Sequence, residues 1–523
     1  MISGWWKAAV VALAMLLPAA AARSQGYLNG SLESNTIFDD DPSSAWHGFH
    51  SNNYLSLDYV NGRFGAGIQG EWYPSPLPGY DLSLKGIGLP YKYLSWNGGN
   101  WSITAGDFYD QFGSGLVLRS REDRNLGLAN SLGGARISAS FFDDALSFTV
   151  LAGAPRQGLW YTKSLVSGAD INYAPGDFSF GISAVARTEK DPDEDMYAVL
   201  NRGAGCVIED VPETVMTLSA RAGWNWNGFS VKAEYVEKSP DFTAIHMASA
   251  SDEYGVRGGR AFLGQLSYFD KKFSATATYR YLYNMEFAAR RTLGTKTLSN
   301  TLNYLPAICR QQTYMLACLN PYETYQEGES GFAGEIIYKP VKGLSFLVGG
   351  SWIDGLGKVL PLREKNHLAY RDIYASAEYR WSKQLKTTLY VSIQENSPTH
   401  GNRKATNAQN VFVLDATYKF SQDLALRGEL QYLYSQELTK DWMAALLDFS
   451  FARDWSISIS DMYNHGSTRE HYWSIGAAYA GPGFRVMAGY GRNREGMVCS
   501  GGVCRYQPEY KGAFVKLQWF FHG

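Results

Sequence analysis

The chain has little charge and, after its first 24 residues, no long apolar run. Only 19% of its 523 residues are charged, and 48 Lys and Arg stand against 50 Asp and Glu, a formal net charge of −2. This balance offers no basic face, so a nucleic-acid partner is not expected. A helix that crosses a bilayer needs about 20 apolar residues, so the sequence excludes a helical membrane protein.

Cysteine is also scarce, with five in the whole chain. Cys499 and Cys504 flank a Gly-Gly pair that lets the chain double back, and Cys309 and Cys318 bracket a second loop stretch. Each pair is a candidate disulfide in an oxidising compartment, while Cys206 is left over. Zinc is the alternative for the first pair, but no histidine or second cysteine pair lies near it in the sequence. No metal or cofactor site is therefore predicted.

Aromatic residues and glycine, in contrast, are abundant, with 35 Tyr, 15 Trp and 54 Gly. Membrane β-barrels need such a composition, because aromatic girdles mark both membrane interfaces. A large extracellular all-β protein shares part of this signature. Composition alone therefore does not decide between these two classes.

Residues 1–24 have the features of a secretory signal peptide. One Lys lies in residues 1–7, an apolar run follows in residues 8–22, and small residues occupy the cleavage region. The run is shorter than the roughly 20 residues that span a bilayer. We therefore expect Sec-dependent export, cleavage after Ala22 or Ser24, and a mature barrel domain in residues 25–523.

From Tyr27 onward, stretches of about ten residues alternate apolar and polar side chains. In one such stretch, Ile373 and Tyr379 share the apolar face, whereas Asp372 and Glu378 share the polar face. Period two places the two sets on opposite sides of a strand. Long strands with one apolar and one polar face are typical of outer-membrane barrels that enclose a wet lumen.

Short turns alternate with longer polar connections along the chain. The short turns carry hairpin signals at Asn61-Gly62, Asn97–Gly99, Asp143-Asp144, Pro175–Asp177, Asn227-Gly228, Asp270–Lys272, Val341–Gly343, Ser382–Gln384, Ser421–Asp423, Arg453-Asp454 and Gly481–Gly483. They predict about 24 strands, within a range of roughly 20 to 26. The predicted fold is all-β, a single large antiparallel transmembrane β-barrel with long external loops and both termini in the periplasm.

One segment departs from the pattern. Residues 106–134 read GDFYDQFGSGLVLRSREDRNLGLANSLGG, rich in glycine and in charges of both signs, and they fall on the long-loop side. We predict that residues 109–133 form a loop folded into the lumen. The candidate constriction residues are Tyr109, Asp110, Gln111, Arg119, Arg121, Glu122, Asp123 and Arg124. Opposed acidic and basic rows orient polar solutes in a pore; the alternatives are a plug pinned to the wall and a surface for a protein partner.

Other clusters have less specific patterns. Asp39–Asp41 and Asp191–Asp195 offer oxygen ligands, but their spacing matches no defined calcium loop. Arg290-Arg291 with Lys296 is a basic cluster suited to lipopolysaccharide phosphates or to solvent.

A catalytic site is not expected. His465 and His471 flank a loop that contains Ser467, with Asp461 nearby. Nothing in the sequence brings these side chains together, and a triad requires their convergence. We therefore expect that the protein is not an enzyme.

The segments RFGAGIQGEWYPSPLPGY (63–80), GIGLPYKYLSW (86–96) and 103–137, with the loops around Leu305-Pro306 and CSGGVCRY, carry a resemblance. The chain resembles a Bacteroidetes-type outer-membrane β-barrel family of unknown function. The resemblance implies a barrel in the outer membrane of a Gram-negative cell and implies no activity. The final strand, Val515 to Phe521, resembles the signal read by the barrel-assembly machinery.

The expected function is a porin-like passive channel for small polar solutes, with the inner loop as its charged constriction. The alternative is a non-conducting barrel that serves as a subunit or scaffold of a larger cell-surface assembly. Expected partners are outer-membrane lipid and lipopolysaccharide, the barrel-assembly machinery during biogenesis, and a protein at the external loops in the alternative case.

Overall fold

The computed structural model describes residues 26–189, 212–245, 253–291, 300–305, 307–356, 367–397, 406–437, 440–500 and 503–523. Across these residues the secondary structure is almost entirely β, with one 3-10 turn, η1 (Leu82–Leu84). No helix in this part of the chain is long and apolar enough to cross a membrane. The predicted signal peptide, Cys206, Asp191–Asp195 and Lys296 lie outside the described residues.

The wall is built from 24 strands, each paired with its neighbours in chain order. The first twelve are β1 (Tyr27–Asp39), β2 (Gly48–Asn61), β3 (Phe64–Ser75), β4 (Gly86–Asn97), β5 (Trp101–Phe108), β10 (Leu132–Phe141), β11 (Leu146–Gln157), β13 (Leu165–Tyr173), β14 (Phe178–Thr188), β15 (Thr214–Trp226), β16 (Phe229–Ile245) and β17 (Glu253–Phe269). The others are β18 (Phe273–Tyr283), β19 (Gly328–Tyr338), β20 (Leu344–Gly355), β21 (His367–Arg380), β22 (Leu385–Asn396), β23 (Asn407–Lys419), β24 (Leu424–Tyr434), β25 (Trp442–Phe451), β26 (Trp455–Tyr463), β27 (His471–Gly481), β28 (Phe484–Asn493) and β31 (Tyr510–His522).

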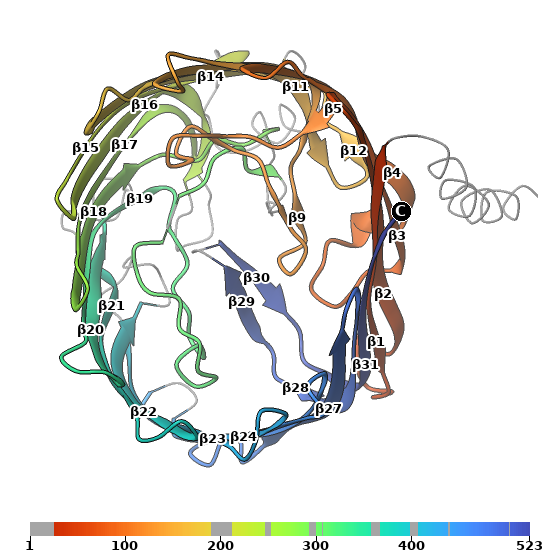
Figure 1. Ribbon diagram of the computed structural model, residues 1–523, viewed down its shortest axis with the longest axis vertical. Coiled ribbons are helices and arrows are strands. Elements are labelled where there is room, and N and C mark those ends of the chain that lie inside the picture. Colours follow the sequence, from red (N-terminus) through yellow and green to blue (C-terminus); the bar gives the residue numbers. More distant parts are fainter. Residues whose placement is uncertain are drawn as a thin grey trace, which may run out of the picture.

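The barrel closes where the first strand meets the last. β1 pairs antiparallel with β31, in a register that sets Leu32 opposite Trp519. A further two-residue strand, β12 (Trp160–Tyr161), attaches to the end of β11 and completes the 25-stranded sheet. Figure 1 shows the strands as a closed ring. The predicted number of strands and their antiparallel order are confirmed.

All eleven predicted short turns lie between successive wall strands, from Asn61-Gly62 between β2 and β3 to Gly481–Gly483 between β27 and β28. The longer connections therefore gather at the opposite rim. Both ends of the described chain lie at the short-turn rim, because Asn29 of β1 pairs with His522 of β31.

The predicted alternation of faces is also confirmed. Ile373 on β21 is 58% exposed on the outside of the wall, while its neighbour Tyr374 is 4% exposed on the lumenal side. Exposed aromatic side chains gather near the short-turn rim, where a membrane interface places its girdle: Trp96, Trp101, Phe141, Phe178, Trp226, Phe229, Phe269, Tyr338, Trp381, Tyr418, Phe420, Trp455 and Trp519. An apolar exterior around a polar interior is the inverse of a soluble fold, and the chain is an outer-membrane-type β-barrel.

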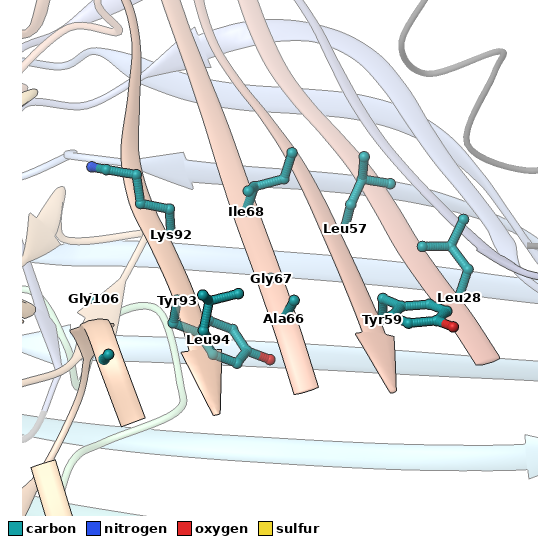
Figure 2. Close-up of a pocket in the computed structure, with 11 residues that line it drawn as sticks. Leu28, Leu57, Tyr59, Ala66, Gly67, Ile68, Lys92, Tyr93, Leu94 and Gly106 are labelled. Atoms are coloured by element: carbon teal, nitrogen blue, oxygen red, sulfur yellow. The ribbon is translucent and has the colours of Figure 1, made fainter. Parts of the chain in front are cut away.

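The wall also carries an apolar hollow of about 420 Å³ on strands β1 to β5. Figure 2 shows its lining side chains, among them Leu28, Tyr59, Ile68 and Leu94, on adjacent strands of the wall. Leu94 is an exposed residue of the apolar exterior. This hollow therefore belongs to the wall and lies apart from the charged inner loop.

Three segments from the long-loop side lie inside the ring (Figure 1). The first is residues 109–131, which contain two small hairpins, β6 (Gln111–Phe112) with β7 (Leu118–Arg119) and β8 (Glu122–Asp123) with β9 (Leu128–Ala129). The second is the described part of the connection between β18 and β19, residues 284–291, 300–305 and 307–327. The third comprises residues 494–500 and 503–509, which contain the hairpin of β29 (Gly496–Ser500) and β30 (Val503–Gln507). We call these the inner loop, the long inward segment and the inward hairpin.

The buried apolar core lies inside the lumen, between these segments and the wall. Phe112 and Leu116–Leu118 of the inner loop pack with Phe287 and Leu302 of the long inward segment. Both segments rest on lumenal valines of β13 to β16, including Val185 and Val236. Since these contacts join distant parts of the chain, burial of apolar area fixes the inner loop against the wall. The predicted inward-folded loop is confirmed.

Candidate functional site

The first turn of the inner loop is fixed to the wall by charged and polar contacts. Asp110 Oδ2 forms an ion pair with Arg136 of β10 at 2.5 Å. Gly113 has φ +56°, and a Cβ at this position would lie 2.6 Å from Arg221 of the wall, so glycine is needed here. The next amide, of Ser114, donates to Glu234 Oε2 at 3.0 Å. This part of the loop is therefore pinned to the lumenal wall.

Tyr109 and Gln111 have local roles. The ring of Tyr109 stacks on Tyr91 of β4, with centroids 5.2 Å apart, and burial raises the pKa of its phenol. Gln111 Nε2 donates to the carbonyl of Gly113 at 2.9 Å. Both side chains shape the loop, and neither belongs to the cavity described below.

A second charged group fixes the tip of the loop. Arg124 pairs with Glu33 of β1 at 2.9 Å and with Glu122 at 3.1 Å, and its guanidinium lies 4.3 Å from the ring centre of Tyr54. Asp123 Oδ1 accepts from the amide of Leu126 at 3.2 Å, which shapes the turn. Six of the eight predicted residues (Tyr109, Asp110, Gln111, Glu122, Asp123 and Arg124) are thus engaged in contacts that shape the loop or hold it in place.

Arg119 and Arg121 are different. Their guanidinium carbons lie 4.1 Å and 4.7 Å from the ring centre of Tyr304, in the long inward segment. Neither arginine takes part in an ion pair within the described residues, whereas Arg124 and Arg136 do. Burial, followed by the nearby charge of Arg119, lowers the pKa of Arg121. Two half-buried positive charges are therefore held side by side on one aromatic ring.

Backbone hydrogen bonds hold this arrangement. The amide of Arg119 donates to the carbonyl of Leu302 at 2.8 Å, and the amide of Tyr304 donates to the carbonyl of Gly115 at 2.9 Å. Asn130 Nδ2 donates to the carbonyl of Thr301 at 2.6 Å. The inner loop and the long inward segment therefore form one unit across the lumen.

The inward hairpin completes the arrangement. Arg505 donates to the carbonyl of Asn125 at the tip of the inner loop (3.2 Å), and Gln311 Nε2 of the long inward segment donates to the carbonyl of Cys499 (2.8 Å). The predicted disulfide between Cys499 and Cys504 is present across the hairpin. All three inward segments therefore contact one another.

A cavity of about 70 Å³ lies where they meet. The inner loop, the long inward segment and the inward hairpin all contribute to its lining, which consists of Arg119, Arg121, Leu128, Asn130, Thr301, Asn303, Tyr304, Leu305, Glu323, Thr324, Gln326 and Val503. Glu323 takes part in no ion pair within the described residues, and burial followed by the charge of Glu327 raises its pKa. The cavity thus has cationic and anionic groups in one lining.

Sequence reasoning placed only Arg119 and Arg121 of this cavity. Tyr304, Asn303, Glu323 and Val503 were missed, because they lie in connections with no distinctive motif. A partial signal existed, since the stretch 284–327 is the longest connection and loops of that length are usually functional.

One predicted disulfide is wrong. Cys309 and Cys318 are both free thiols. Cys309 packs against Tyr322 and Tyr370, whereas the residues around Cys318 pack in a separate cluster with Trp442. The neighbours of the two thiols thus belong to different packing clusters, although the sequence separation alone allowed a bridge.

The histidines and the nearby acidic residue converge only in part. His471 Nδ1 lies 2.7 Å from Asp461 Oδ2, so these two side chains do meet. Ser467 contributes to the turn instead, where its amide donates to Asn464 Oδ1 at 2.8 Å. Within the described residues, no group of three or more His, Cys, Asp or Glu is placed to hold a metal ion.

Residues 4–521 match a protein family described as "Family of unknown function (DUF6029)". The chain belongs to this family. No curated protein matches the DUF6029 chain. The family description assigns no activity, so a function for this DUF6029 barrel rests on its own lumenal geometry.

Several solved barrels are similar in architecture to this DUF6029 protein. The P pilus usher (PapC) translocation pore is 10% identical, with a TM-score of 0.45 over 95% of this chain and 99% of its own. The siderophore receptor PirA from Pseudomonas aeruginosa is 10% identical, with a TM-score of 0.45 over 95% and 81%. OccK8 (OprE) from Pseudomonas aeruginosa is 12% identical, with a TM-score of 0.39 over 83% and 98%.

Proposed function

We propose that this protein is an outer-membrane channel for small polar solutes, with its narrowest point at the junction of the three inward segments. In this proposal the chain is exported by the Sec pathway, inserted by the barrel-assembly machinery, and surrounded by phospholipid and lipopolysaccharide. The single observation that carries the proposal is the charged cavity at that junction. A passive pore selects solutes by the size and electrostatics of its constriction.

The polar lumenal wall supports the same proposal. Arg427 of β24 forms ion pairs with Asp415 and Asp448 on the neighbouring strands, at 3.0 and 3.7 Å, and is only half-buried. Arg371 of β21 pairs with Glu395 of β22, also half-buried. Incompletely buried ion pairs of this kind suit a hydrated interior, because full burial would impose a large desolvation cost.

Single-channel conductance in a planar bilayer tests the proposal. The wild type is expected to conduct, and modification of Gln326→Cys with a cationic thiol reagent is expected to reduce the current, because Gln326 lines the cavity. Ile373→Cys on the exposed outer face is the matched control, and its current should not change. The wild type treated with the same reagent controls for modification of the native cysteines.

The contrary result is equally clear. A purified wild type that does not conduct, together with an Arg505→Ala variant that also stays closed, would overturn the channel proposal. Arg505 is the informative residue because it ties the inward hairpin to the inner loop.

One observation favours a second candidate function, a non-conducting barrel that serves as a subunit of a larger surface assembly. The mutual hydrogen bonds of the three inward segments are also what a permanent plug requires. In that case the external loops would bind a protein partner. Copurification of one partner at stoichiometric yield, with no conductance in any variant, is the expected outcome for this alternative.

A further inference from the structure

The cavity at the junction is small and built from side chains of all three inward segments. Each buried water needs at least roughly 10–15 Å³ of such space, so about 70 Å³ holds about five water-sized groups. This is the size of the ionic end of a small solute and smaller than a sugar ring. The cavity therefore suits the polar end of a molecule whose remainder extends into the lumen.

The two arginines in the lining, Arg119 and Arg121, favour an anion. Most lumenal arginines, such as Arg156 and Arg187, have a carboxylate partner at 2.6 to 2.9 Å. Arg119 and Arg121 both lie over the ring of Tyr304, and within the described residues neither has a carboxylate at ion-pair distance, although the charge of Asp123 acts on Arg121 from farther away. Like charges at close range repel each other, and a carboxylate placed between two guanidiniums relieves this repulsion through charge-assisted hydrogen bonds.

The carboxylate in the lining, Glu323, favours a cation. Glu323 is half-buried, and the charge that acts on it is that of another carboxylate, Glu327. Burial and this neighbour raise the pKa of Glu323, so its ionised form lacks compensation. An ammonium group beside Glu323 would supply that compensation and would favour the ionised carboxylate.

Two further polar atoms lack partners among the described residues. Asn303 is 4% exposed, and its Oδ1 accepts no hydrogen bond, although its Nδ2 donates to Leu116 and Met285 carbonyls at 3.2 and 2.7 Å. Thr324 Oγ1 is buried and likewise has no partner. Both residues line the cavity. Since buried polar groups are normally hydrogen-bonded, these atoms point to a polar ligand.

We propose that this cavity binds the zwitterionic end of a free amino acid or a similar small solute, with the carboxylate at Arg119 and Arg121 and the ammonium at Glu323. The assignment rests on the proposed channel and names its solute class. A simple anion such as phosphate would meet Glu323 without compensation, and a simple cation would meet the two arginines. Only a dipolar solute satisfies both the cationic and the anionic groups of the lining.

Equilibrium binding to the purified full-length barrel in detergent tests the assignment without any need for conductance. The probe is radiolabelled L-alanine, and the competitors are acetate, methylammonium and L-alanine methyl ester. We expect saturable binding of alanine, with each competitor weaker by at least about tenfold, since each has only one of the two charges.

Matched variants test the contacts to the ammonium group and to the carboxylate group of the solute separately. Glu323→Gln is expected to weaken alanine at least about tenfold and to leave acetate unchanged or tighter. Arg119→Gln with Arg121→Gln should weaken alanine and acetate alike. Arg453→Gln, in a turn at the opposite rim, is the control and should bind as the wild type does. The electrophoretic shift of the folded barrel verifies that each variant has assembled.

The outcomes distinguish this inference from the channel proposal. Equal affinity for acetate and alanine, with no effect of Glu323→Gln, would overturn the zwitterion assignment, and so would an absence of alanine binding in a barrel that conducts. Selective alanine binding by a barrel that never conducts would uphold the site and overturn the channel.

Discussion

The guanidinium of Arg505 lies 4.3 Å from the ring centre of Tyr80, although 425 positions separate the two residues in the sequence. The same guanidinium donates to the carbonyls of Pro78 (3.1 Å) and Asn125 (3.2 Å). One side chain of the inward hairpin thus joins the loop after β3 to the tip of the inner loop.

Replacement of Arg505 by Ala is therefore expected to release the inward hairpin. Hydrogen bonds from charged groups contribute about 1.5–3 kcal/mol each, so the loss of this contact should favour an open hairpin. Hydrogen exchange of residues 494–509 should accelerate, and single-channel current should rise. Arg453→Ala, at the exposed pair with Asp423, serves as the control. Unchanged exchange in the Arg505 variant would show that the hairpin is held by other contacts.

Arg156 and Glu71 form a buried ion pair inside the barrel, with nitrogen and oxygen 2.6 Å apart and side chains 2% and 1% exposed. Arg156→Met should destabilise the barrel by about 3–5 kcal/mol, because it leaves the Glu71 carboxylate buried without its partner. Arg453→Met breaks an exposed pair and should cost at most about 1 kcal/mol. Urea unfolding in detergent, followed by tryptophan fluorescence, measures both. A second substitution, Glu71→Gln, should recover part of the loss, and a failure to do so would contradict this explanation.

The cysteines should separate into two classes on alkylation. Burial raises the pKa of Cys309 to about 12 and that of Cys318 to about 11, and the thiolate is the reactive form. We expect slow labelling of both in the folded protein at pH 8, faster labelling as the pH approaches these values, and complete labelling after unfolding without reductant. Cys499 and Cys504 should label only after reduction. Peptide mapping that found Cys309 linked to Cys318 would contradict the structure.

Replacement by Phe should have different effects on stability at two tyrosines, Tyr161 and Tyr109. The hydrogen-bond ladder between β4 and β5 ends at Tyr93 and Gly106, and Gly106 has φ +103°. Beyond this point the carboxylate of Asp107 accepts hydrogen bonds from the Lys92 amide (3.0 Å) and from the Tyr161 hydroxyl (2.7 Å). Tyr161→Phe should therefore destabilise the barrel by about 1.5–3 kcal/mol.

Tyr109→Phe is the matched comparison. Its hydroxyl is buried and has no hydrogen-bond partner among the described residues, so removal should be neutral or stabilising. Thermal unfolding, followed by the loss of the folded electrophoretic band, measures both variants. A large loss of stability in the Tyr109 variant would show that its hydroxyl does have a partner.

Much of the fold was predictable because the relevant signals are local. Alternation at Ile373 and Asp372 reports which face of a strand meets lipid, and a pair such as Asn227-Gly228 marks a tight turn within a few residues. The inner loop was predictable by a count of strands, since an additional strand between β5 and β10 would have reversed the direction of every later one.

The site was only partly predictable. The sequence singled out Arg119 and Arg121 among eight charged or polar residues, but it gave no reason to distinguish them from Arg124, which is ion-paired to the wall. The spacing of Cys309 and Cys318 suggested a bridge, but both are free thiols, and their neighbours pack in separate clusters. Sequence distance carries no information on which cluster a lumenal side chain joins.

The sequence by itself therefore determined a large antiparallel barrel, its turns and the loop that enters it, because period-two alternation and turn chemistry act over short distances. Only the tertiary structure decided that Arg119, Tyr304, Glu323 and Val503 share one cavity. Closure of the sheet through β1 and β31 sets where the three inward segments enter the lumen, and burial of apolar side chains then selects how these segments meet.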